Sequence, residues 1–324
     1  MFNMRRKINS ALIGCGAIGF FNDFHSRKKG TFSHFKSMYK SDLFNLIAIM
    51  DKDQKKLNII NKKYGINTYK SYFSMLSENK VDLIVIATPD KTHIKILKEI
   101  ISFKPKIVLC EKPISNNLRD IKKIISLYKK NKIHLLVNYS FRFNSDFNKI
   151  KEILDSKKLG KTFKLNATYS RGYFHNACHY IDFALWLFGE PKTIEVIDSH
   201  KSKSYQEDYT VSVNLKYNNN LNVQISGVDL DNIASTGLSI VCERGIIVVN
   251  PIDEIKIFKI RKNRNQPSEN EFYLASNKKI NYGNSMLCHY KNIHDLFHNK
   301  VNAISPIKGL VEIARINEKV KKLI

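Results

Sequence analysis

The chain has 324 residues, of which 43% are hydrophobic, and this content is ordinary for a globular protein with two domains. The net charge is +25, yet only 10 of the 54 basic residues are Arg and the Lys residues are spread over the whole chain. Proteins that bind nucleic acid usually carry Arg-rich basic residues clustered on one surface, so nucleic acid is not expected as a partner. No apolar run is long enough to span a bilayer, which argues against a membrane protein. Five cysteines without close pairing are typical of a reduced, cytoplasmic protein.

A short apolar strand predicted at residues 8–13 runs directly into the glycine motif Gly14-Cys15-Gly16-Ala17-Ile18-Gly19. In such a strand-to-helix turn, Gly14 permits the tight turn, Gly16 lets a pyrophosphate approach the backbone, and Gly19 lets the next helix pack closely. The N-terminus of that helix offers N–H groups to the phosphates. The motif therefore predicts a dinucleotide site.

Two further interpretations of this segment stay open. Arg5, Arg6 and Lys7 precede apolar residues, and residues 12–15 are similar to a lipoprotein cleavage box, as in a targeting segment. Its apolar core would be only residues 8–13, which is shorter than such a segment needs. The second possibility is a glycine-rich loop without a ligand. The position directly after a first strand favours the dinucleotide turn.

An acid follows the second predicted strand, residues 44–50, at Asp51. A carboxylate there accepts hydrogen bonds from both ribose hydroxyls and repels a 2′-phosphate, which favours NAD over NADP. The adjacent Lys52 makes this preference weaker, because its positive charge would attract a phosphate. The gap from the glycines is longer than usual, and we interpret the polar residues 22–31 as an inserted loop. Asp51 could also be the N-cap of a helix predicted at 52–64.

Strands and helices alternate through the first half of the chain. A short strand and a short helix are predicted around 67–77, further strands at 81–87, 107–110 and 134–138, and helices at 33–40, 92–103 and 118–130. This alternation predicts a doubly wound parallel sheet, in which ligands bind beyond the carboxyl ends of the strands. The loops at 14–19, 88–93 and 111–113 lie at that edge.

The second half of the chain changes character. Helices are predicted at 146–157, 175–188, 284–298 and 308–323, and strands at 163–171 and successively from 193 to about 274. This pattern predicts an α+β domain with a large, open, mainly antiparallel sheet. The predicted domains are therefore 1–140, a Rossmann domain, and 141–324, with a C-terminal helix that is able to pack back on the first domain.

Further motifs follow the glycines in a fixed order. They are Ala87-Thr88-Pro89 with His93, Glu111-Lys112-Pro113, Phe141-Arg142-Phe143, His179-Tyr180-Ile181-Asp182 and Trp186-Leu187-Phe188-Gly189-Glu190-Pro191. Over residues 8–191 their order and spacing resemble the Gfo/Idh/MocA family, the relatives of glucose-fructose oxidoreductase and inositol dehydrogenase. The resemblance implies a nicotinamide-dependent oxidoreductase that acts on CH–OH groups of a sugar, cyclitol or nucleotide sugar. It also implies a homodimer or homotetramer that packs through the open face of the C-terminal sheet.

The resemblance places Lys112 beside the reacting carbon and gives His179 a part in proton transfer. The residue types suit these roles, because a histidine is a natural base near neutral pH and a lysine can stabilise negative charge on the substrate oxygen. On one helix, His175, His179 and Asp182 would share a face, which we expect to line the cleft opposite the nicotinamide. The expected catalytic residues are Lys112, His175 and His179, and the expected substrate-binding residues are Lys112, Arg142, His175, His179 and Asp182. The expected cofactor-binding residues are Gly14, Gly16, Ala17, Ile18, Gly19, Asp51, Thr88, Pro89, His93, Glu111 and Lys112.

The sequence departs from the family at one position. Many members carry Asp four residues before the helix histidine, and His175 stands there in this chain. An imidazole cannot act as a carboxylate would, which argues against an inositol-like substrate and favours a nucleotide sugar, as in surface-polysaccharide precursor synthesis. A metal bound by His175, Cys178 and His179 is conceivable, but no further ligand stands at a recognisable spacing, so no metal is expected.

Arg142 and His93 each have a structural interpretation beside the functional one. Arg142 could pair with an acid at the domain junction, and His93 fits a structural residue at a helix start better than a catalyst. The function as a whole also has two rivals to the dehydrogenase. Some relatives hold NAD tightly and cleave a glycosidic bond by transient oxidation. A binding protein that senses NAD or a sugar without chemistry is the second rival.

Overall fold

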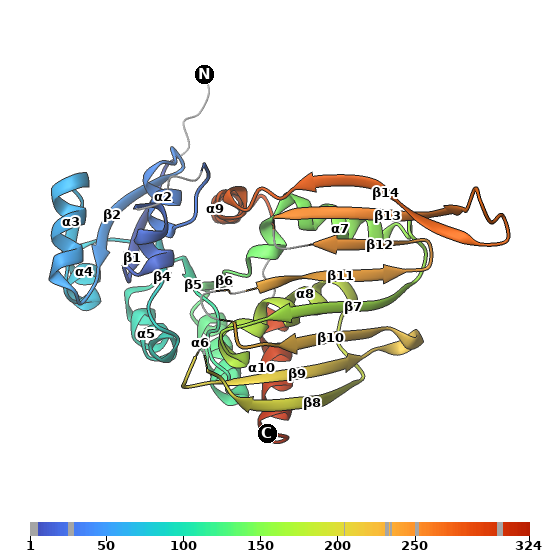
Figure 1. The fold of residues 1–324 in the computed structure, drawn as a ribbon. Coiled ribbons are helices and arrows are strands. Elements are labelled where there is room, and N and C mark those ends of the chain that lie inside the picture. The colour runs from blue at the N-terminus through green and yellow to red at the C-terminus, as the bar shows by residue number, and fades with distance from the viewer. Residues whose placement is uncertain are drawn as a thin grey trace. The chain divides into compact units, whose positions relative to one another are not determined.

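A computed structural model of the chain describes residues 6–24, 29–203, 205–230, 233, 235–249, 253–302 and 307–324. Arg5 of the targeting interpretation and residues 25–28 of the predicted inserted loop lie outside these residues. The chain forms two compact units. Unit 1 comprises Met1–Phe143 and Tyr282–Val311, and unit 2 comprises Asn144–Asn281 and Glu312–Ile324 (Figure 1).

Unit 1 contains a six-stranded sheet in the order β3-β2-β1-β4-β5-β6, with all strands parallel. The strands are β1 (Ile8–Ile13), β2 (Phe44–Met50), β3 (Asn67–Tyr69), β4 (Leu83–Ile86), β5 (Ile107–Cys110) and β6 (His134–Val137). The strand order reverses between β1 and β4, and a ligand of such a sheet binds beyond the carboxyl ends at this point. The predicted doubly wound parallel sheet is confirmed.

The helices of unit 1 come from both ends of the chain. They are η1 (Ala17–Phe21), α1 (Asn22–Phe24), α2 (His34–Tyr39), α3 (Gln54–Tyr64), α4 (Tyr72–Glu78), η2 (Asp90–Thr92), α5 (His93–Glu99), η3 (Ile100–Phe103), α6 (Leu118–Lys130), η4 (Ser140–Phe143) and α9 (Gly283–Phe297). The prediction for α6 is confirmed at both ends, where Asn117 caps the N-terminus by accepting from Arg119 N at 2.9 Å and Asp120 N at 3.2 Å.

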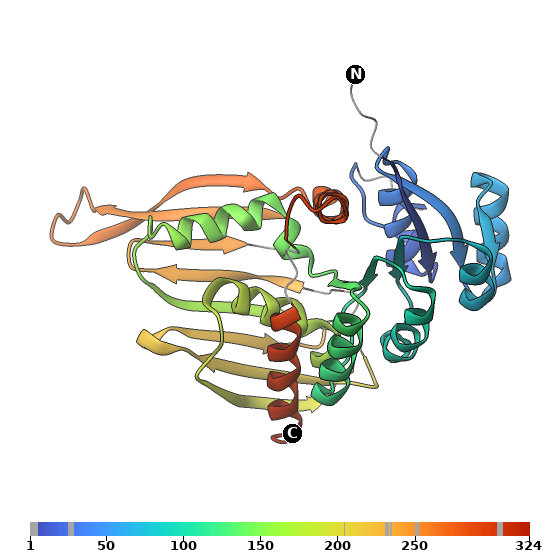
Figure 2. The same cartoon turned by 180° about the vertical axis from the view of Figure 1, so that it is seen from behind.

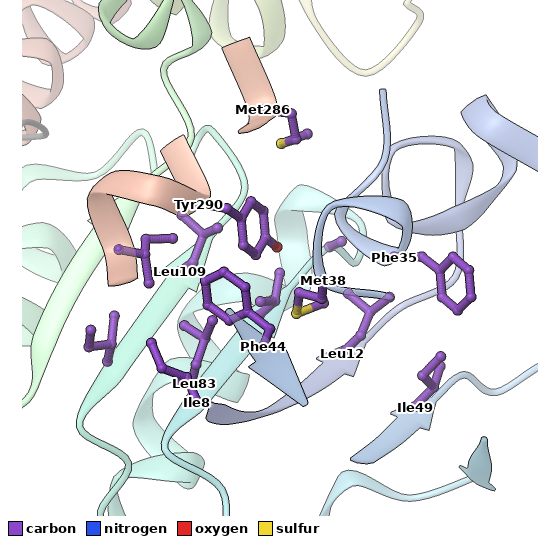
Figure 3. Packing of buried hydrophobic residues seen from close by; sticks show 14 of the residues in the cluster. Ile8, Leu12, Phe35, Met38, Phe44, Ile49, Leu83, Leu109, Met286 and Tyr290 are labelled. Atoms are coloured by element: carbon purple, nitrogen blue, oxygen red, sulfur yellow. The ribbon is translucent and has the colours of Figure 1, made fainter. Parts of the chain in front are cut away.

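Helix α9 belongs to unit 1 because its apolar residues complete the core of the parallel sheet. Met286 and Tyr290 join the same buried cluster as Leu12 of β1, Met38 of α2 and Leu109 of β5 (Figure 3). Each large apolar side chain that is removed from water here stabilises the fold by roughly 1.5–3 kcal/mol.

Unit 2 contains an eight-stranded sheet in the order β14-β13-β12-β11-β7-β10-β9-β8. Its neighbours are antiparallel except for β7 and β10, which run parallel. The strands are β7 (Thr162–Tyr169), β8 (Thr193–Lys201), β9 (Tyr209–Lys216), β10 (Asn222–Gly227), β11 (Ser235–Cys242), β12 (Gly245–Val249), β13 (Glu254–Lys262) and β14 (Asn270–Lys279). The predicted, mainly antiparallel α+β architecture is confirmed.

The helices of unit 2 gather on one face of this sheet. They are α7 (Ser145–Asp155), η5 (Tyr173–Ala177), α8 (Cys178–Phe188) and the part of α10 (Ile307–Lys321) from Glu312 onwards. The short η6 (Asn218–Asn220) lies in the turn between β9 and β10. Figures 1 and 2 show α7, α8 and α10 on the same side, while the opposite side of the sheet carries no helix of this unit in the described residues. Across the described residues, no helix is long and apolar enough to cross a membrane.

Candidate functional site

The glycine turn at the end of β1 follows the geometry that its sequence predicts. Gly14 has a φ of +100°, and a Cβ there would lie 2.5 Å from the carbonyl oxygen of Ala87. A Cβ on Gly19 would collide with the carbonyl oxygen of Gly14. A Cβ on Gly16, in contrast, would meet no described atom within 4 Å beyond its chain neighbours. Packing therefore requires glycine at 14 and 19, and the open space at 16 fits a bound pyrophosphate.

The helix after the turn differs from the expected one. Ala17 and Ile18 begin the π-helix η1, in which Phe20 N and Phe21 N donate to Gly16 O at 2.9 and 3.1 Å. The three-residue α1 follows directly. The N–H groups that this segment could offer to a phosphate are therefore those of the turn and of the first turn of η1, and not those of a long α-helix.

Asp51 lies beside the glycine turn. Its Oδ2 accepts from Cys15 N at 2.7 Å, and its Oδ1 accepts from Asp53 N at 2.9 Å. A carboxylate has further lone pairs, so these contacts leave acceptor capacity for a ribose. The interpretation of Asp51 as the cap of the next helix is wrong, because Asp53 is the N-cap of α3 and accepts from Lys55 N at 2.9 Å.

His93 links two of the predicted cofactor loops. It is fully buried at the start of α5, with Nε2 2.8 Å from Thr88 O and Nδ1 2.8 Å from Pro113 O. The Lys112–Pro113 peptide, in the second of these loops, is cis. Both ring nitrogens are occupied by main-chain oxygens, which fits the structural interpretation of His93. This side chain acts on the site by holding the two loops together.

Glu111 ends β5 and is 7% exposed. Its Oε1 accepts from His34 Nε2 at 2.8 Å and from Asn138 Nδ2 at 2.7 Å, and its Oε2 accepts from Lys112 N at 3.3 Å. Burial by itself would raise the pKa of Glu111, but the hydrogen bond and charge of His34, the hydrogen bond of Asn138 and the charge of Lys112 lower it to about 2. Glu111 is therefore a carboxylate at neutral pH, and its oxygens bind protein donors.

Two neighbouring residues of α9 extend this cluster. The Tyr290 hydroxyl lies 2.9 Å from His34 Nδ1, and His289 Nδ1 lies 3.0 Å from Asn138 Oδ1. The His289 ring stacks on Phe143, with centroids 3.6 Å apart. Burial lowers the pKa of His289 to about 3, so this ring is neutral at pH 7.

Sequence reasoning missed four members of the cluster. Asn138 directly follows β6 at the same edge of the sheet as Glu111, and this position was a usable signal. His34, His289 and Tyr290 gave no such signal, because their role depends on how α2 and α9 pack.

Two residues of unit 1 that the sequence predicted for the substrate site are Lys112 and Arg142. Lys112 is half-buried, and Arg142 lies on η4 and is 5% exposed.

The predicted substrate residues of unit 2 lie on two different kinds of helix. His179, half-buried, and Asp182, 2% exposed, lie three residues apart on α8. His175 lies in the π-helix η5, so the expectation of one α-helical face for all three residues is wrong. The His175 ring stacks on Tyr205, with centroids 4.7 Å apart and planes 15° apart.

A buried carboxylate fixes the turn that carries His175. Asp208, 3% exposed, accepts from Phe174 N at 3.2 Å, His175 N at 2.9 Å and Tyr209 N at 2.7 Å. A Cβ on Gly172, where φ is +86°, would collide with the same carboxylate. Sequence reasoning missed Asp208, since no motif surrounds it. In the part of the chain that the structure describes, no group of three or more His, Cys, Asp or Glu residues could hold a metal.

Relatives of this chain include sugar and cyclitol dehydrogenases. It is 29% identical over 136 residues to myo-inositol 2-dehydrogenase of Thermotoga maritima, covering 42% of this chain and 40% of that protein. It is 26% identical over 170 residues to D-apiose dehydrogenase of Rhizobium rhizogenes, covering 52% of this chain and 45% of that protein. The chain thus spans about half the length, or less, of these curated relatives.

Solved structures share the fold over nearly the whole chain. An oxidoreductase from Agrobacterium radiobacter, solved with NAD+, L-tartaric acid and magnesium, has a TM-score of 0.76 at 17% identity and covers 97% of this chain and 95% of its own. A dehydrogenase from Chromobacterium violaceum has a TM-score of 0.77 at 14% identity and covers 98% of this chain and 96% of its own. At such identities the likeness shows the fold alone.

Two family models match separate parts of the chain that together make up more than half of it. Residues 8–139 match the model described as the oxidoreductase family with an NAD-binding Rossmann fold, and residues 172–248 match the GFO/IDH/MocA C-terminal domain. The chain therefore belongs to the Gfo/Idh/MocA family, and its first unit contains the NAD-binding Rossmann domain of that family.

Proposed function

We propose that the protein is an NAD(H)-dependent oxidoreductase that transfers a hydride between nicotinamide and a secondary alcohol or ketone of a sugar. The observation that carries this proposal is that three features lie at the same edge of the parallel sheet: the glycine turn with open space at Gly16, Asp51, and the loop in which Lys112 N donates to Glu111. The myo-inositol and apiose dehydrogenases among the relatives support a sugar or cyclitol as the substrate class.

The residues of unit 1 that would hold the cofactor fit NAD. The space above Gly16 suits the pyrophosphate, and the acceptor capacity of Asp51 suits the two ribose hydroxyls. A 2′-phosphate would meet the Asp51 carboxylate, so we propose NAD rather than NADP. When bound, the nicotinamide supplies the hydride acceptor or donor.

The remaining chemistry is assigned to two side chains. Lys112 hydrogen-bonds the substrate oxygen and stabilises its developing negative charge, and His179 accepts or returns the hydroxyl proton. His175, which stacks on Tyr205, takes part in substrate binding with Asp182 and Arg142. Because His175 stands where many members carry Asp, we propose a nucleotide sugar, in surface-polysaccharide precursor metabolism.

The structure describes all five cysteines and none of them forms a disulfide. Free cysteines are typical of a reducing compartment, so we place the reaction in the cytoplasm.

We also propose that the protein is a homodimer or homotetramer that associates through the open face of the unit 2 sheet. That sheet exposes several large apolar side chains, among them Ile197 at 54%, Phe272 at 53% and Leu274 at 50%. Phe272 and Leu274 lie two residues apart on the edge strand β14, whereas Ile197 lies on β8 at the other edge, and exposed apolar groups that gather on one strand favour an interaction surface. Light scattering of the purified protein would measure the mass, and a monomer would contradict this assignment.

The proposed activity is tested by the nicotinamide absorbance of the purified protein, before and after addition of a panel of nucleotide sugars and free sugars. Reduction of bound NAD by one of them would support the dehydrogenase and name its substrate class. Net hydrolysis of a glycosidic bond without a net absorbance change would identify a glycosidase instead. Bound nucleotide whose redox state no sugar changes would favour the sensing protein and contradict the dehydrogenase.

A further inference from the structure

We propose that His34 and Asn138 are positioning residues for Lys112, and that they act by holding the Glu111 carboxylate against the main chain of Lys112. The catalytic consequence rests on the proposed function, in which Lys112 contacts the substrate oxygen. The contacts themselves lie entirely within unit 1 and can be tested without any substrate.

Glu111 is fixed by two side-chain donors from different elements, His34 in α2 and Asn138 directly after β6. His34 Nε2 and Asn138 Nδ2 reach the same oxygen, Oε1, at 2.8 and 2.7 Å. Such charge-assisted hydrogen bonds are short and about twice as strong as neutral ones. Because a carboxylate is planar, fixing Oε1 also fixes the direction of Oε2. That second oxygen accepts from Lys112 N at 3.3 Å, so the orientation of Glu111 is transmitted to the main chain of the lysine.

The ionised state of Glu111 sets the direction of each hydrogen bond in the cluster. An ionised carboxylate only accepts, so His34 carries its proton on Nε2 and Asn138 turns its amide nitrogen toward Glu111. The oxygen of Asn138 then faces His289 Nδ1, which must be the donor. The hydrogen bonds from His34 and Asn138 to Glu111, and from His289 to Asn138, therefore each have one direction.

Both donors also contact side chains of helix α9. His34 rests on the hydroxyl of Tyr290 at 2.9 Å, and the Tyr290 ring packs edge-on against Phe44 in the core (Figure 3). Asn138 rests on His289, whose ring stacks on Phe143. Helix α9 therefore supports both donors at once, although it follows Lys112 by about 170 residues. On the other side of Lys112, His93 binds the carbonyl oxygen of Pro113.

The experiment uses two substitutions of His34, each of which keeps one of its two hydrogen-bonding positions. In His34→Gln the amide nitrogen can take the place of Nε2 and donate to Glu111. In His34→Asn the shorter side chain takes the place of Nδ1, toward Tyr290, and cannot reach Glu111. Both variants lose the ring, and each keeps one of the two contacts of His34, so the contrast separates the hydrogen bond to Glu111 from the contact with Tyr290.

The readout is amide hydrogen exchange of Lys112 in the full-length protein. We expect the Lys112 amide to exchange about tenfold faster in His34→Asn, as expected for the loss of one hydrogen bond to a charged group, and to stay close to the wild type in His34→Gln. The amide of Ile121, which donates to Asn117 O at 3.1 Å in α6, is the internal reference for general loosening of the fold. Equal acceleration of the Lys112 amide in both variants, or of Ile121 together with Lys112, would overturn the proposal.

Asn138→Ser removes the second donor and leaves His34 in place, so it repeats the test if His34→Asn does not fold. Once the absorbance panel has named a sugar, kcat should fall about tenfold in His34→Asn, while the KM for the sugar and the Kd for NADH change little. His34→Gln should recover most of that loss. An unchanged kcat in His34→Asn would overturn the positioning role, whereas a wild-type protein that oxidises no sugar would sink the proposed function and leave the exchange result standing.

Discussion

The Lys112 loop of unit 1 and the His175 turn of unit 2 are both held by a buried carboxylate that accepts main-chain N–H groups, but the two carboxylates differ in their partners. Glu111 has two side-chain donors in addition to Lys112 N, and its pKa is lowered to about 2. Asp208 binds three main-chain N–H groups, and burial raises its pKa despite those bonds. Glu111 is therefore harder to protonate than an ordinary glutamate, whereas Asp208 is easier to protonate than an ordinary aspartate.

This difference indicates what each turn is built to do. A buried charge is tolerated only where donors fully compensate its desolvation, and the cluster around Glu111 meets that condition beside the proposed catalytic lysine. In the turn of His175, the buried carboxylate accepts from the main-chain N–H groups of Phe174 and His175, and the His175 ring stacks on Tyr205. We therefore expect changes at the Lys112 loop to act mainly on turnover and on acid stability.

The largest expected effect comes from the lysine itself. Lys112→Met removes the only charged group that the proposal places on the substrate oxygen, so turnover should fall by at least about 10³-fold. NADH binding, measured by fluorescence titration, should be retained, because the glycine turn and Asp51 are untouched. Lys95→Met on the exposed side of α5 is the matched control. Turnover in Lys112→Met equal to that of this control would remove Lys112 from the catalytic assignment.

Much of this loop could be predicted from the sequence because its signals are local. The apolar strand β5, the Glu111-Lys112-Pro113 motif and the Asn117 cap all lie within a dozen residues, and both β5 and α6 have the predicted bounds. The role of Glu111 could not be predicted in this way. Its hydrogen-bond donors come from distant segments, and only the packing of α2 shows that His34 binds its carboxylate oxygen.

The His175 turn shows a second limit of sequence reasoning. Residues spaced by four suggest one α-helical face, but η5 is a π-helix, whose wider turn is invisible in such a pattern. Asp208, which fixes this turn, stands 33 residues beyond His175 in a segment without a motif. Helix and strand positions follow from local periodicity, whereas the hydrogen bonds that orient site residues depend on which segments meet.

The next largest effect concerns stability and separates the two carboxylates by pH. Glu111 has a folded-state pKa of about 2 against an ordinary value of 4.5, so its contribution to stability is present above pH 4.5 and is lost as the pH falls toward 2. The shift corresponds to about 3 kcal/mol. Glu111→Gln should therefore be strongly destabilised at pH 7 in urea unfolding, and its deficit relative to the wild type should shrink at pH 3. A deficit that is the same at both pH values would contradict the ionised, compensated Glu111.

The smallest expected effect has the opposite sign and tests the comparison most directly. The pKa of Asp208 is raised above its ordinary value of 3.8, so its contribution to stability is present below that value and is lost as the pH rises through the folded-state pKa. The wild type should therefore gain stability relative to Asp208→Asn as the pH falls, whereas it loses stability relative to Glu111→Gln over the same range. Urea unfolding of both variants across pH 3–7 measures the two slopes side by side. Slopes of the same sign would contradict this comparison, because the donors and positive charges around Glu111 should make it harder to protonate, whereas burial should make Asp208 easier to protonate.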